Sequence, residues 1–163
     1  MKRAILMGLA LTCLARASYA WLDATEKQCE ERYGNPSPQQ PTLGSDKTLF
    51  YRKDEMRVTA DFVKDKCLRI SYGTPSWTTQ GEIDIFFKAN GGYSVWTHFK
   101  GGGGGDYVRS DGLAKAKVEM GLGGGVTFTA YAWEKAHAQA IQDVEAAKQE
   151  AEKERLKKLE HDF

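Results

Sequence analysis

Residues 48–72, TLFYRKDEMRVTADFVKDKCLRISY, carry the clearest strand pattern of the chain. Apolar and polar residues alternate from Met56 to Phe62, which is the period of a strand with one buried face. Polar turns at 52–55 and 64–66 separate this strand from a strand at 49–51 and another at 68–72. The stretch therefore predicts an antiparallel meander. Because a bare meander exposes one apolar face to water, this meander needs helices to cover it.

Two capping boxes predict those helices. Thr25 precedes Gln28 by three residues, and Thr79 precedes Glu82 by the same spacing. In such a box the two side chains satisfy each other's backbone donors at a helix start. The first helix should end at Gly34, and the second at 90–92. The intervening segment 35–46, rich in Pro, Ser, Gln and Gly, is typical of a loop.

The second half of the chain repeats the order of the first. Strands are expected at 93–99, 107–109, 113–120 and 126–131. At an offset of 57 residues Gly34 aligns with Gly91 and Asp54 with Asp111. We therefore predict an α+β fold of two αβββ units, residues 22–72 and 79–132. Their meanders should join in one antiparallel sheet of about six strands, with the helices on one face.

Residues 1–20 have the pattern of a secretory signal peptide. Lys2 and Arg3 precede an apolar run, and Ser18-Tyr19-Ala20 resembles a cleavage site. Removing this leader leaves 23 − 3 = 20 basic and 22 acidic residues, a net charge of −2. The sequence thus predicts an exported, periplasmic or secreted, soluble domain at 21–132. We expect no membrane span in the mature chain and no nucleic-acid partner, since nucleic-acid binding requires a basic face.

Cys29 and Cys67 remain after the leader, and an exported protein can oxidise them. Cys29 should face the core, but Cys67 is in the opposite phase to Leu68, Ile70 and Tyr72. The sequence leaves undecided whether the two cysteines form a disulfide.

Residues 133–163 contain no Gly or Pro and are rich in Ala, Glu, Lys and Gln, which predicts a long charged helix. Its first turns carry an apolar seam from Trp133 to Val144, but Glu154 and Lys158 interrupt that seam later. A sustained coiled coil is therefore not expected. We expect the first turns to dock on the domain and the rest to project. A helix that docks on a partner is the alternative.

No motif in the sequence indicates a cofactor, a metal or a catalytic residue. The glycine runs at 101–105 and 121–125 lack the signature of a phosphate-binding loop, and we interpret them as flexible hairpin linkers. His98, His137 and His161 are not spaced as metal ligands. An enzyme is therefore the less expected class.

One set of residues suggests a binding surface. If Tyr93 and Phe99 face the helices, Trp96 and His98 lie on the open face of the sheet. Arg57 and Arg69 should lie near them, and large aromatics with arginine are common anchors of protein interfaces. The alternative is that the C-terminal helix folds back and buries Trp96.

The sequence TEKQCEERYGNP at 25–36, followed by an aromatic strand and a meander ending LRISY at 68–72, resembles small exported bacterial domains. These are of the outer-membrane-assembly small lipoprotein and β-lactamase-inhibitor-protein type. The resemblance covers 22–131 at the level of layout and implies αβ units that bind proteins. We therefore expect a non-enzymatic protein-binding or envelope-associated domain, whose partner and oligomeric state the sequence does not specify. The alternatives are a hydrolase-like enzyme with a site around His98, or a small-molecule carrier with an apolar cavity between sheet and helices.

Overall fold

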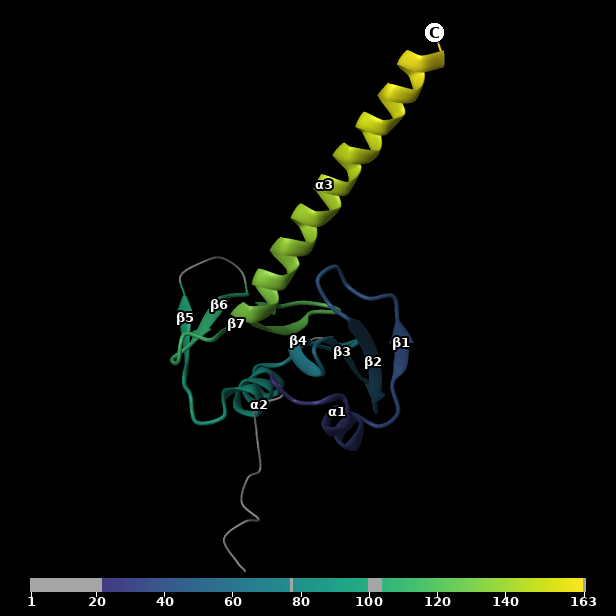
Figure 1. The fold of residues 1–163 in the computed structure, drawn as a ribbon. Helices are drawn as coiled ribbons and strands as arrows, with labels where there is room; N and C mark the ends of the chain where they lie inside the picture. The colour runs from purple at the N-terminus through teal and green to yellow at the C-terminus, as the bar shows by residue number, and fades with distance from the viewer. Residues whose placement is uncertain (1–21, 77, 100–103, 163) are drawn as a thin grey trace, which may run out of the picture.

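The computed structural model describes residues 22–76, 78–99 and 104–162 and shows an α+β fold with one open antiparallel sheet (Figure 1). The predicted leader at 1–20 and most of the 101–105 glycine run lie outside the described residues. The elements are, in chain order, α1 (Glu26–Tyr33), β1 (Ser37–Gln39), β2 (Lys47–Lys53), β3 (Met56–Val63), β4 (Lys66–Gly73), α2 (Gln80–Gly91), β5 (Trp96–Phe99), β6 (Asp106–Arg109), β7 (Ala114–Glu119), β8 (Gly125–Ala130) and α3 (Tyr131–Asp162).

The sheet has eight strands in the order β1-β2-β3-β4-β8-β7-β6-β5, so the prediction of about six strands was too low. One strand that the sequence did not predict is β1, at the edge of the sheet in the segment expected to be a loop. It is three residues long and contains Pro38, and a strand this short shows no alternation to recognise. Proline is accepted there because an edge strand leaves one row of N–H groups unpaired.

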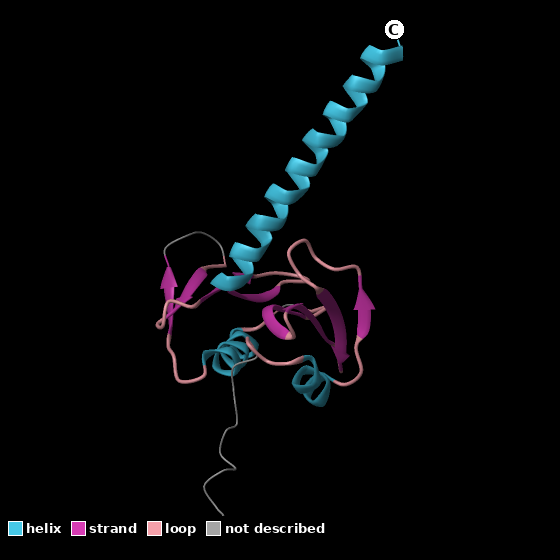
Figure 2. Cartoon of the chain, viewed as in Figure 1, coloured by secondary structure: helices cyan, strands magenta, loops and turns pink. Residues whose placement is uncertain are grey.

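Both predicted helix starts are confirmed. Thr25 caps α1 and Thr79 caps α2, each in a complete capping box. Both helices lie on the same face of the sheet, α1 over the first meander and α2 near the second (Figure 2). The fixed offset of 57 is wrong at the helix ends. Gly34 caps α1 with φ +87°, whereas Gly91 is still helical and Gly92, with φ +58°, takes the capping position.

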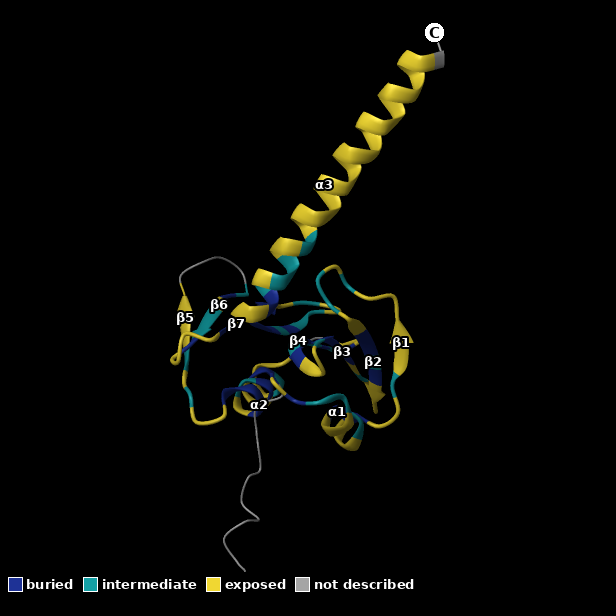
Figure 3. Cartoon of the chain, in the orientation of Figure 1, coloured by how far each residue is buried: buried dark blue, intermediate teal, exposed yellow. Residues whose placement is uncertain are grey.

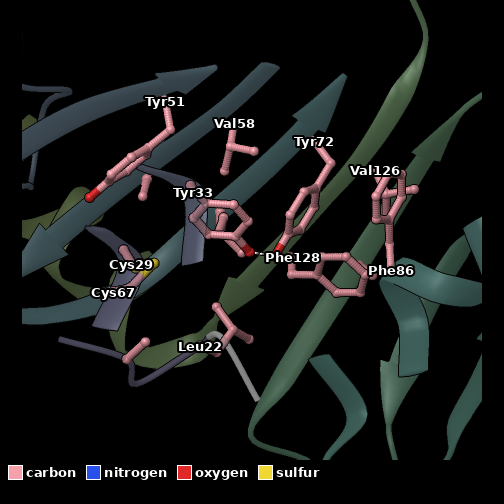
Figure 4. Packing of buried hydrophobic residues seen from close by; sticks show 14 of the residues in the cluster. Leu22, Cys29, Tyr33, Tyr51, Val58, Cys67, Tyr72, Phe86, Val126 and Phe128 are labelled. Carbon is pink, nitrogen blue, oxygen red and sulfur yellow. Dashed lines mark hydrogen bonds between the residues drawn. The ribbon is translucent and has the colours of Figure 1, made fainter. Parts of the chain in front are cut away.

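The core lies between the sheet and these two helices (Figure 4). Tyr51, Val58, Ile70 and Phe128 are its fully buried centre. Cys67 also faces the core, because the register of β3 and β4 shifts at Leu68, which has no partner in β3. Such a bulge inserts one extra residue into a strand, so the side chains before it point to the opposite face from the one that strict alternation predicts. The phase argument against Cys67 facing the core therefore fails.

The third helix leaves the sheet on the opposite face. Trp133 is buried in its first turns, while every described side chain from 141 to 161 is exposed (Figure 3). The predicted arrangement, docked first turns followed by a projecting helix, is confirmed. Gly44 permits the docking, because a Cβ at this position would lie 2.6 Å from the Cα of His137.

Candidate functional site

A cleft of about 640 Å³ opens between the end of α1, the β2–β3 turn and α2. Its floor is apolar and aromatic, made by Tyr33, Met56, Tyr72 and Phe86, and the exposed Ile85 lies at its lip. Pockets that hold small ligands or single side chains usually have this size and lining. The cleft is therefore the candidate binding site of the domain.

Two tyrosine hydroxyls supply the polar groups of the floor. The Tyr33 and Tyr72 hydroxyl oxygens are 2.8 Å apart (Figure 4). Asn90 donates from Nδ2 to the Tyr72 oxygen at 3.3 Å. Phe86 stacks on Tyr72 with a centroid distance of 4.7 Å. Burial raises the pKa of both tyrosines, so both hydroxyls stay protonated near neutral pH. The floor can thus form neutral hydrogen bonds but offers no charge.

The charge is at the rim. Four acidic residues line the cleft against two basic ones, a difference of 2 − 4 = −2; these are Glu31, Asp54, Glu55 and Glu82, against Arg32 and Lys53. Lys53 is also engaged, because its Nζ donates to the Arg32 carbonyl oxygen at 2.9 Å. Backbone and side-chain hydrogen bonds from Thr79 lower the pKa of Glu82, which keeps that carboxylate ionised. An apolar group that carries a positive charge therefore suits this cleft.

A second groove of about 450 Å³ lies between α2 and β5. Phe87, Trp96 and Tyr107 line it. Among the described residues the buried Trp96 Nε1 has no hydrogen-bond partner. This groove has fewer charged groups than the first, with Asp84 and Lys88 at its edge.

The four residues predicted as a binding surface do not come together. Trp96 packs edge-to-face on Phe87 and Phe128, whose centroids lie 5.4 and 5.2 Å from its own, so it is on the helix-covered face. The predicted phase is wrong because β5 begins only at Trp96 and the residues before it form a loop. His98 is on the same face as Trp96, against Tyr107, and is exposed. Trp96 is half-buried against Phe87 of α2 and Phe128, and not beneath the C-terminal helix, so the predicted fold-back of that helix over Trp96 does not occur.

Arg57 and Arg69 lie on the opposite face. Arg57 is exposed on β3. Arg69 pairs with the buried Asp61 at 2.9 Å, and its guanidinium lies 5.1 Å from the Trp133 ring centroid. Asp61 also accepts a hydrogen bond from Thr48 at 2.6 Å. This network therefore fixes α3 to the sheet, which gives Arg69 a structural role.

Cys29 and Cys67 are free thiols, both fully buried, and their sulfur atoms lie side by side (Figure 4). The pKa of the Cys67 thiol is raised, mainly by its hydrogen bond with Cys29 and also by its burial. The thiolate needed for reaction with oxidants is therefore suppressed in the folded chain.

His98 forms no hydrogen bond or ion pair with a carboxylate within the part of the chain that the structure describes. In the same ranges no three His, Cys, Asp or Glu side chains are grouped as metal ligands. None of the described helices combines the length and apolarity that a membrane crossing requires.

No protein-family model matches this chain, and neither the curated proteins nor the solved structures include a significant match. The resemblance to small lipoprotein and inhibitor domains thus stays a prediction.

The sequence analysis did not identify Tyr33 or Tyr72, which line the floor of the cleft, as part of a site. The missing information was the packing of the end of α1, the β2–β3 turn and α2 around the cleft, which no local pattern in the sequence encodes. One local signal was Ile85. Ile83 and Phe86 are three residues apart and share the buried face of α2, so helical periodicity places Ile85 on the other face, where the structure shows it 63% exposed.

Proposed function

We propose that this chain is an exported, non-enzymatic binding domain whose interhelical cleft holds an apolar side chain with an adjacent positive charge, presented by a partner protein. One observation carries the proposal: an aromatic floor with two neutral hydroxyls lies beneath a rim with excess acidic residues. The floor provides apolar contact and the rim selects the sign of the charge.

The exposed Ile85 supports a protein partner. A large apolar side chain at the lip of a cleft extends the contact area beyond the cleft itself, as interface anchors do. The same cleft lies between sheet and helices, where a small-molecule carrier was also anticipated. A carrier is therefore the second candidate, and it differs in requiring no contact at Ile85.

The chemistry of the cleft can be tested with two small probes that share one apolar body. Phenethylamine carries a cation and 3-phenylpropionate an anion on the same phenyl-ethyl group. In ¹⁵N NMR titrations at low salt, phenethylamine should shift the backbone amides of Tyr33, Tyr72 and Phe86, and the anion should bind more weakly. Equal affinity for the two probes would contradict charge selection by the acidic rim. If neither probe binds, the cleft is not a binding site.

Two variants separate rim from lip. Asp54→Asn with Glu55→Gln removes two rim charges and should abolish the preference for the cation. Ile85→Lys changes the lip and should prevent capture of a partner from an envelope fraction. Leu122→Lys is the matched control, because Leu122 is 75% exposed and outside the cleft. Capture that is unaffected by Ile85→Lys, with probe binding intact, would favour the carrier.

A further inference from the structure

The projecting part of α3 carries an apolar stripe that nothing in the described chain covers. Ile141, Val144, Leu156 and Leu159 are between 38% and 48% exposed. Ile141 and Leu159 are five helical turns apart and point in the same direction, and the other two lie about 60° to either side. The four residues therefore form one stripe, with Lys148 and Glu152 between its ends.

We propose that this stripe pairs antiparallel with the same stripe of a second copy of the chain, about a two-fold axis at the level of Glu150. That arrangement sets Ile141 against Leu159 at each end of the overlap, and Val144 and Leu156 flank these contacts on opposite sides of the helix pair. Such two-fold contacts are the commonest form of self-association.

The charges between the apolar pairs decide the direction. In the antiparallel arrangement Lys148 faces Glu152 near the centre of the stripe, and this contact between opposite charges occurs twice by symmetry. In a parallel arrangement each of these residues faces its own copy, which brings like charges together. Facing charges of this kind set orientation and partner choice in paired helices.

The length of the helix fits this overlap. The helix end at Asp162 comes level with Ala138 of the second copy, close to where α3 leaves its own domain. The two domains then lie at opposite ends of the pair and do not meet. The contact is small, so we expect a weak dimer that forms at high concentration. The core and the interhelical cleft take no part in it.

Sedimentation equilibrium of the purified protein, from low micromolar to near-millimolar concentration, tests the pairing. We expect a reversible monomer–dimer equilibrium. Glu152→Lys sets two positive charges against each other and should weaken the dimer roughly tenfold or more. Adding Lys148→Glu restores opposite charges at that contact and should recover most of the affinity.

Glu150→Lys is the matched control, since it makes the same charge change half a turn away, on the far side of the helix. Circular dichroism confirms that each variant keeps its helix. A monomer at every concentration would overturn the proposal. An equal effect of Glu152→Lys and Glu150→Lys, or no recovery in the double variant, would overturn the antiparallel register.

Discussion

The hydroxyl of Tyr72 joins the two halves of the domain, so its removal should destabilise the fold measurably. Tyr72 lies on β4, Tyr33 on α1 and Asn90 on α2, and the Tyr72 oxygen contacts both of the others at 2.8 and 3.3 Å. Tyr72→Phe keeps the ring and its stacking but removes both of these buried hydrogen bonds, while Asn90 Nδ2 still donates to the Phe86 carbonyl oxygen at 3.0 Å. Each lost hydrogen bond costs about 0.5–1.5 kcal/mol, so we expect the free energy of unfolding to fall by about 1–3 kcal/mol.

For a domain of this size each kcal/mol lowers the midpoint of thermal unfolding by about 4 °C. Thermal unfolding followed by circular dichroism will measure the shift in Tyr72→Phe, Tyr33→Phe and the double variant. The double variant should be less destabilised than the sum, because both single changes break one shared hydrogen bond. A midpoint within about 1 °C of the parent for Tyr72→Phe, against the expected loss, would refute the view that this hydroxyl stabilises the fold.

Four other results are expected. Gly44→Ala should lower the free energy of unfolding by roughly 1–3 kcal/mol, because Gly44 has φ +89° and lies directly against α3. The change should also expose Trp133 to water and shift its fluorescence to the red, and unchanged emission would contradict this. Refolding in a glutathione redox buffer should bridge Cys29 and Cys67 and raise stability by about 4 kcal/mol, which a matched sample with reducing agent should lack. The free energy of unfolding should fall above about pH 10, by about 1.4 kcal/mol per pH unit for each of Tyr33 and Tyr72, because the unfolded chain loses tyrosine protons that the folded chain keeps. A urea midpoint that does not change from pH 9 to 11 would disprove this. Trp96→Ala should cost up to roughly 3 kcal/mol, because this half-buried ring packs against the core, and an unchanged melting curve would contradict that packing.

The elements of the fold with strong local signals could be predicted from the sequence. Thr25 and Thr79 cap their helices as expected, and the alternation at 56–62 gives β3 its buried face. The misplaced features depend on single-residue shifts that periodicity cannot detect. A late start of β5 reversed the facing of Trp96, and a bulge at Leu68 turned Cys67 inward.

The candidate site could not be predicted for a different reason. A cleft is defined by the distance between helices, and neither α1 nor α2 encodes that distance in its own sequence. The charged turn at 52–55 was visible, but its position beside α1 and α2 results from packing. Sequence patterns therefore indicate which faces are buried, and the tertiary structure is needed to show where burial is incomplete.

The junction of β4 with β8 has a consequence for how this chain can be divided. These are the last strands of the two halves, and they pair antiparallel from Arg69↔Thr129 to Gly73↔Gly125. A half-chain ending after β4 would expose that strand along its whole length, and two such halves could join through it in the same eight-strand order. The present chain is what fusion of two copies of a self-pairing half would produce. Cutting the link between β4 and α2 should therefore leave fragments that reassemble.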